Sequence, residues 1–152
     1  MQIRLWVLAL SVACACPALA QTRAGFPDVV DALRAAPGVM GVETAHTAGR
    51  RVIFAWFEGK RALRDWYRSD AHQKAMNAVF PDLVPQRQPL AELADDSGPI
   101  IAIVSVKFAE TAIASIGIEL YGPLPGGVAV GGRFAPESLE VRGLRELRLA
   151  PQ

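Results

Sequence analysis

Apolar residues recur along this chain with two different periods, which divide it into helices and strands. Between Phe26 and Leu33 they fall at i, i+3, i+4 and i+7, one face of a helix that Pro37 ends. Residues 51–58 instead carry large apolar side chains on both alternating faces. Such a strand is central in its sheet and covered on both sides, and residues 42–47 before it complete a hairpin.

The helical period returns over residues 60–80, with a joint in the middle. Ser69 and Asp70 can cap a fresh start, and Gln73 stands three residues after Asp70, which is capping-box spacing. Pro81 ends the pattern. The segment therefore predicts two consecutive helical pieces.

The second half of the chain is predicted to be mostly β. A loop over 81–99 leads to a strongly apolar strand at 100–108. A hairpin follows over 115–134, because two alternating stretches flank a turn rich in glycine and proline. Arginines interleaved with leucines after Pro136 predict a short helix within a loosely held tail.

This order of elements predicts an α+β fold, in which an antiparallel sheet carries helices on one face and an extra C-terminal β-hairpin. The chain length fits one domain behind a leader. We expect a signal peptide over 1–20, an α+β domain over 21–135 and a C-terminal tail over 136–152. No later apolar run approaches the roughly 18 residues that a membrane span needs, so no membrane span is expected.

Residues 1–20 have the three parts of a secretory signal peptide. Arg4 gives a positive n-region, and an apolar h-region too short to span a bilayer follows. Ala18 and Ala20 are small residues at the −3 and −1 positions. Cleavage between Ala20 and Gln21 is therefore expected, which predicts a periplasmic or secreted protein.

Cleavage would remove both cysteines, Cys14 and Cys16, unless one of them carries a lipid or the leader stays uncut as an anchor. The chain has 16 basic and 15 acidic residues, so the loss of Arg4 brings the net charge close to zero. The charges form no basic stripe, and nucleic acid is not expected as a partner. Without thiols, stability has to come from a packed core or a partner subunit.

A strand that ends in Trp56 and an acid is followed, after a short gap, by Ala-Leu, Trp66, Ser-Asp and His72. Together with residues 26–43, this pattern resembles the antibiotic-biosynthesis-monooxygenase-like domain. That family forms dimeric α+β barrels with a ferredoxin-like fold. The resemblance covers roughly residues 26–108 and implies a homodimer.

Two departures from the family's pattern change what the resemblance implies. The family begins with a strand before its first helix, and here the C-terminal hairpin is expected to supply the missing edge strand. Haem-degrading relatives carry an iron-ligating His ten residues after the Trp, where this chain has Met76. No cofactor is therefore expected and haem is expected to bind only weakly. No metal is expected either, because His46 and His72 fit no standard ligand spacing.

Trp56, Trp66, Tyr67 and His72 are the candidate lining of a substrate pocket. His72 and Trp66 are also the catalytic candidates, since imidazole titrates near neutrality and an indole stacks on aromatic substrates. The alternative is structural. Both tryptophans lie on apolar stripes typical of core residues, and a His near a helix start is commonly held by hydrogen bonds.

The resemblance implies an exported protein that binds a small molecule in an α+β barrel. As an enzyme it would be a cofactor-independent monooxygenase, which oxidises an aromatic compound in an apolar cavity that positions and desolvates it. The alternative is a non-catalytic binding or structural module of the same fold. A convergent pair of perturbed polar groups in a closed cavity favours the enzyme, and a filled barrel favours the module.

The strand at 100–108 is apolar on both faces until Ser105. Two helices cover only one face of the sheet, and a soluble protein does not leave the other bare. The leading expectation is a homodimer through the sheet, in which a second copy covers that face across a two-fold axis. The alternative is that the C-terminal hairpin folds over the face within one chain.

The signal-peptide assignment predicts that the mature protein starts at Gln21. N-terminal sequencing of the exported protein checks this. A start at Cys14 or Cys16 with a bound lipid would contradict it and make the protein membrane-anchored.

Overall fold

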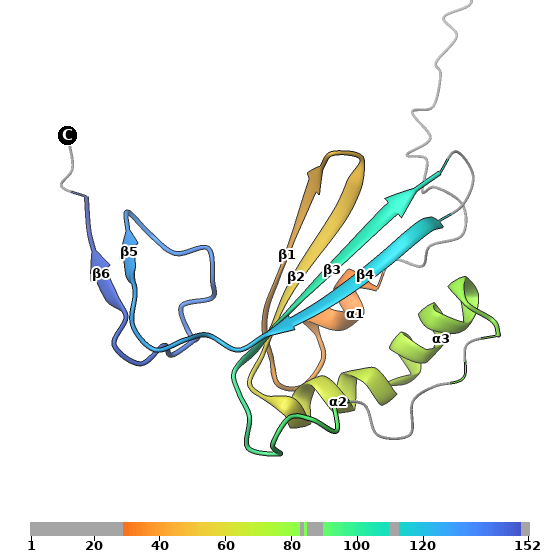
Figure 1. Ribbon diagram of the computed structural model, residues 1–152, viewed down its shortest axis with the longest axis horizontal. Helices are drawn as coiled ribbons and strands as arrows, with labels where there is room; N and C mark the ends of the chain where they lie inside the picture. The colour runs from red at the N-terminus through yellow and green to blue at the C-terminus, as the bar shows by residue number, and fades with distance from the viewer. Residues whose placement is uncertain (1–28, 83, 85–89, 110–112, 150–152) are drawn as a thin grey trace, which may run out of the picture.

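Four antiparallel strands form the centre of the molecule (Figure 1). The computed structural model describes residues 29–82, 84, 90–109 and 113–149, and the proposed signal peptide lies outside them. The strands run in the order β1-β2-β3-β4. They are β1 (Val39–Thr47), β2 (Arg50–Phe57), β3 (Ile100–Phe108) and β4 (Ile113–Tyr121). The α+β class, the first hairpin and the central place of β2 are confirmed.

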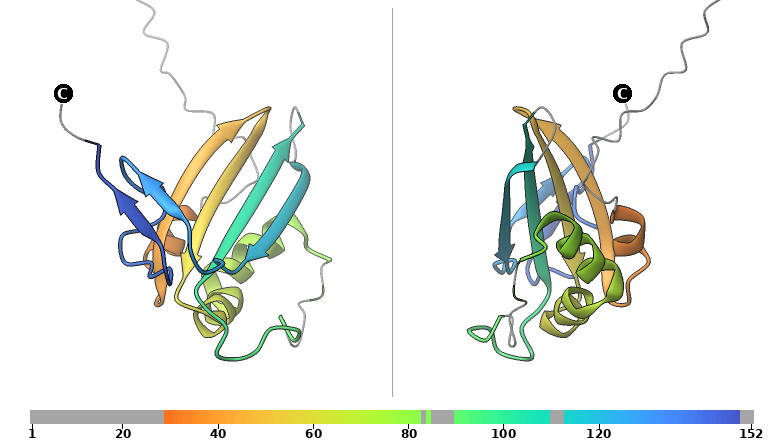
Figure 2. Two further views of the ribbon diagram at one scale, coloured as in Figure 1. Left: turned by 60° about the vertical axis from the view of Figure 1, so that its left-hand side comes forward. Right: turned by 90° about the vertical axis from the view of Figure 1, so that its right-hand side faces the viewer.

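Helices α1 (Val30–Arg34), α2 (Lys60–Arg68) and α3 (Asp70–Val79) lie on one face of this sheet (Figures 1 and 2). The core beneath them is built around β2. Ile53, Ala55 and Phe57 point from β2 into it and pack with Leu33 of α1 and Leu63 of α2. Because side chains alternate along a strand, Phe54 and Trp56 point to the opposite face.

The joint predicted between the two helical pieces is confirmed, with Ser69 as its central residue. Ser69 ends α2 and caps α3, since its hydroxyl oxygen accepts a hydrogen bond from the backbone N–H of His72 at 3.2 Å. The capping box expected from Asp70 and Gln73 is wrong, because the cap lies one residue earlier, at Ser69. Asp70 is already the first helical residue, where its negative charge is favourable near the helix N-terminus.

The C-terminal segment covers part of the helix-free face. The ring of Phe134 lies edge-on to Trp56 and Phe54, at centroid distances of 5.3 and 5.1 Å. Pro136 sits over Gly41 of β1 so closely that a Cβ there would lie 2.5 Å from the proline Cγ. Leu139 is 5% exposed. A segment of the same chain therefore covers the helix-free face over parts of β1 and β2.

The C-terminal hairpin over 115–134 is wrong. Strand β5 (Val128–Val130) does not return along β4, but pairs in parallel with β6 (Arg145–Leu147), at one side of the molecule in Figure 1. The connection after β4 is too long for a tight hairpin turn, and prolines at 123 and 125 supply no N–H for strand pairing. The chain therefore leaves the sheet after Tyr121.

The short helix expected after Pro136 is also wrong. Gly143, in the middle of that stretch, has a φ of +76°, which ends any right-handed helix at that point. Beyond it, residues 145–147 are extended as β6. The sequence placed the boundary between the domain and its tail at residue 135. β5 lies before that boundary and β6 lies after it, and the two strands pair, so the expected tail is folded together with the segment before it.

Two glycines let the loop before β3 lie directly on the start of α2. The backbone N–H of Lys60 donates to the carbonyl of Ser97 at 2.7 Å. A Cβ on Gly98 would lie only 2.3 Å from the carbonyl oxygen of Glu58 and 2.5 Å from the Cα of Gly59. Backbone meets backbone at this point, so no side-chain rotation can make room.

Gly98→Ala is therefore expected to lower the free energy of unfolding by about 1–3 kcal/mol, the usual cost of overpacking. Urea denaturation followed by circular dichroism measures it. Gly122→Ala is the matched control, because the nearest atom to a Cβ there is 3.9 Å away. Equal stability of the two variants would contradict the close approach.

Candidate functional site

The four residues expected to line one pocket are divided between the two faces of the sheet. Trp56 is buried on the helix-free face, where it contacts Phe54 and Phe134. Trp66 packs against the core on the helix side, and its neighbours Tyr67 and His72 lie with it. The sheet stands between the two groups, so these four residues do not line one pocket. The cause is the alternation of β2, which turns Phe57 towards the helices and Trp56 away from them.

His72 holds the two helices together. Its Nδ1 lies 2.9 Å from the carbonyl oxygen of Tyr67, near the end of α2, and the side-chain amide of Gln73 donates to the same oxygen. A carbonyl only accepts, so Nδ1 carries the proton and Nε2 holds the lone pair. The imidazole ring also lies 5.7 Å from the Trp66 ring and 5.2 Å from the Tyr67 ring. These contacts match the structural alternative stated for this histidine.

Burial lowers the pKa of His72, and the hydrogen bond to the Tyr67 carbonyl offsets only part of that shift. The side chain is therefore neutral at physiological pH. Its contacts orient it within the helix pair and away from the other face of the sheet.

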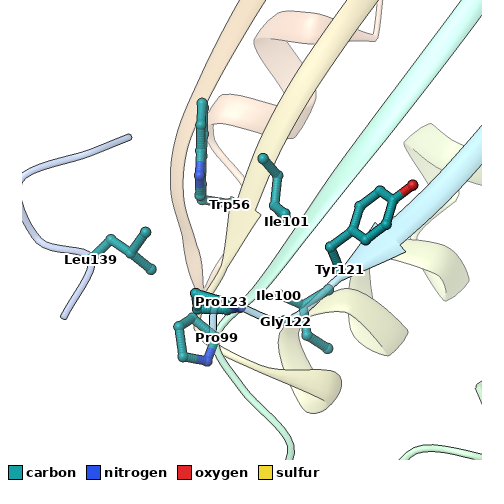
Figure 3. Close-up of a pocket in the computed structure, with 8 residues that line it drawn as sticks. All are labelled: Trp56, Pro99, Ile100, Ile101, Tyr121, Gly122, Pro123 and Leu139. Carbon is teal, nitrogen blue, oxygen red and sulfur yellow. The ribbon is translucent and has the colours of Figure 1, made fainter. Parts of the chain in front are cut away.

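A pocket of about 210 Å³ opens on the helix-free face, where the ends of three strands meet the C-terminal segment (Figure 3). Trp56 and Ile101 form its floor and Leu139 lies across from them. The full lining, named here the Trp56 pocket, is Trp56, Pro99, Ile100, Ile101, Tyr121, Gly122, Pro123 and Leu139. No carboxylate, amine or imidazole side chain is among these residues.

Tyr121 brings the one hydroxyl of the pocket lining. The hydroxyl donates a hydrogen bond to the carboxylate of Glu119, and Figure 3 shows it directed away from Trp56. That hydrogen bond and the negative charge of Glu119 raise the pKa of Tyr121. The phenol is therefore protonated at neutral pH and already has an acceptor.

Sequence reasoning missed Lys60, the one buried charged residue in the part of the chain that the structure describes. Its ammonium group donates to the carbonyl of Leu93 and lies 2.9 Å from Asp95 Oδ1. The hydrogen bond from Lys60 and its charge hold the pKa of Asp95 below its usual range. These contacts fasten the 90–99 loop to α2. A lysine beside a helix start carries no sequence signal of burial.

The described residues contain no group of three or more His, Cys, Asp and Glu side chains placed to hold a metal ion. They also contain no helix long and apolar enough to cross a membrane. The expectations about haem and metal binding stay predictions.

Comparison of the chain with known protein families, with curated proteins and with solved structures finds no match.

The buried His72 predicts a loss of stability in acid. Its pKa is lower in the folded than in the unfolded protein, so between the two values the unfolded chain binds more protons. Stability is then complete above about pH 6.5, the ordinary imidazole value, and falls as the pH drops from there towards the folded pKa.

Thermal melts of the wild type and His72→Asn between pH 8 and pH 5 test this. The asparagine amide can still donate to the Tyr67 carbonyl, but it does not titrate. The melting temperature of the wild type should fall more steeply below about pH 6.5 than that of the variant. Parallel curves would show that His72 is not the titrating group.

Proposed function

We propose that this protein is an exported binding module without catalytic machinery of its own, which holds a small apolar ligand in the Trp56 pocket. The observation that carries the proposal is the pocket itself: an apolar floor of Trp56 and Ile101, with Leu139 bordering the opposite side. Ligand sites are typically concave and mostly apolar. Export rests on the signal-peptide pattern of residues 1–20.

The size of the pocket limits the ligand class. A cavity of about 150 Å³ lined by apolar side chains binds benzene. A pocket of about 210 Å³ therefore suits a flat compound of one or two rings. The small exposed part of Trp56 borders the pocket and can make an edge-to-face contact with such a ring, which is worth about 0.5–1.5 kcal/mol beyond its buried area.

The position of the titratable groups favours a module over an enzyme. His72, whose pKa is shifted, lies on the far side of the sheet and already bonds the Tyr67 carbonyl. Tyr121 is engaged with Glu119. A general acid or base has to reach its substrate within hydrogen-bond distance. Tyr121 is the one titratable side chain of the lining, and its raised pKa keeps the phenol protonated near neutral pH.

The same proposal takes the fold as a permuted ferredoxin-like sheet, the fold of the monooxygenase-like family that residues 26–108 resemble. β4, at the other end of the chain, adds a fourth strand at the edge beside β3. Because β2 and β3 pair directly, the sheet is a meander and its strand order differs from the split β-α-β order of that fold. The antiparallel order and the helices on one face support this assignment.

The second candidate function is cofactor-independent oxidation of a hydroxylated aromatic compound, which the family resemblance implies. An apolar pocket suits it, since such chemistry depends on positioning and desolvation of the substrate. Uptake of dioxygen by protein mixed with 1-naphthol separates the candidates. Binding without uptake supports the module, and protein-dependent uptake supports the oxidase.

Filling the pocket should weaken ligand binding. Ile101→Trp places a larger side chain on the pocket floor and is expected to weaken binding of 1-naphthol at least 10-fold, equivalent to about 1.4 kcal/mol. Equilibrium dialysis of the mature protein against the fluorescent ligand measures the dissociation constant.

Ile103→Trp is the matched control, because Ile103 lies on the same face of β3 but does not line the pocket. It should leave the dissociation constant within about twofold. Equal effects of the two substitutions, or no measurable binding to the wild type, would overturn the proposal.

A further inference from the structure

Strand β4 forms one outer edge of the sheet. It pairs with β3 on one side only, and Figure 2 shows no described helix or strand along its other side. All nine of its residues are extended, so a row of backbone N–H and C=O groups faces outwards. Such an edge is a template for another strand.

The sequence of β4 gives this edge little protection. Natural edge strands are blunted by lysine, proline or charged side chains. β4 contains no lysine, arginine or proline, and Glu119 is its one charged residue. The opposite edge, β1, exposes Glu43 and His46, and none of the eleven large apolar side chains that are exposed among the described residues lies on it. On β4, Ile118 is 54% exposed and Tyr121 is 51% exposed. Apolar side chains thus stand beside open hydrogen-bonding groups.

The side chains of β4 are complementary to those of an antiparallel copy centred on Gly117. In that register Ile116 lies opposite Ile118 of the second copy, and Ser115 lies opposite Glu119 of the second copy. At the ends, Ala114 meets Leu120 and Ile113 meets Tyr121. Apolar residues face apolar ones, and the two carboxylates face hydroxyls instead of each other, as favourable cross-strand pairs require.

We infer that two copies of this chain associate edge to edge through β4, with a two-fold axis at Gly117, into one eight-stranded antiparallel sheet. The exposed Ile118 is buried in a cluster of four isoleucines on the helix side of the joint sheet. The face-to-face dimer expected from the sequence is disfavoured, because Phe134, Pro136 and Leu139 already occupy part of that face. The edge has no such cover among the described residues.

A lysine at the centre of the edge tests the association. Ile118→Lys places two ammonium groups within the isoleucine cluster and is expected to shift the dimer dissociation constant at least 100-fold in sedimentation velocity. Val128→Lys is the matched control: Val128 is 55% exposed, lies on β5, and its replacement should leave the dimer unchanged. Circular dichroism confirms that both variants fold.

A wild-type protein that stays monomeric at 100 μM would overturn the inference, and so would a dimer that survives Ile118→Lys. The second result would indicate face-to-face packing, because the Ile118 side chain points to the helix side and away from such an interface.

A cysteine on the axis tests the register separately, and does not depend on how Ile118→Lys folds. In a chain with Cys14 and Cys16 replaced by Ser, Gly117→Cys should oxidise to a disulfide-linked dimer, since facing Cα atoms about 4.5–5.5 Å apart fit disulfide geometry. Ala114→Cys is the control, because its counterpart lies six residues along the partner strand, about 20 Å away. Cross-linking of Ala114→Cys alone, or of neither variant, would contradict the register.

Discussion

The burial of Trp56 beneath the C-terminal segment is the interaction that shapes the helix-free face of the sheet: Phe134, itself 63% exposed, lies edge-on to the indole, and Leu139 is buried nearby. Strand β2 is apolar on both faces, and the helices cover only one of them. The C-terminal segment brings Phe134 and Leu139 to the other face, where Trp56 is 3% exposed. Burial of one large apolar side chain contributes roughly 1.5–3 kcal/mol, a large share of a typical folding stability.

Because the C-terminal segment covers one face and the helices cover the other, the two faces of the sheet have different roles. On the helix side, Leu63 and Phe57 are packed in the core and His72 bonds the helix joint. On the other side, the C-terminal segment meets the sheet without filling the space next to Ile101. A pocket formed where a segment crosses a strand end can admit a ligand without disturbing the main core.

Local patterns along the sequence predicted the parts of the fold that depend on near neighbours. The double apolar alternation of residues 51–58 indicated a central strand, and Ser69 marked the helix joint. The patterns failed where distant segments meet. A three-residue strand such as β5 shows no preference for a parallel partner, and only the backbone of Gly143 shows why no helix forms beyond it. The prediction that Trp56 and His72 share one site failed for the same reason, since the two residues lie on opposite faces of the sheet.

The most direct test of this account uses the indole groups of the two tryptophans beyond the signal-peptide region, Trp56 and Trp66. In ¹⁵N-labelled mature protein each gives one side-chain N–H resonance, and Trp66→Phe assigns them. Titration with 1-naphthol should move the resonance of Trp56 and leave that of Trp66 in place. Movement of the Trp66 resonance alone would put the ligand on the helix side and contradict the assignment of the pocket.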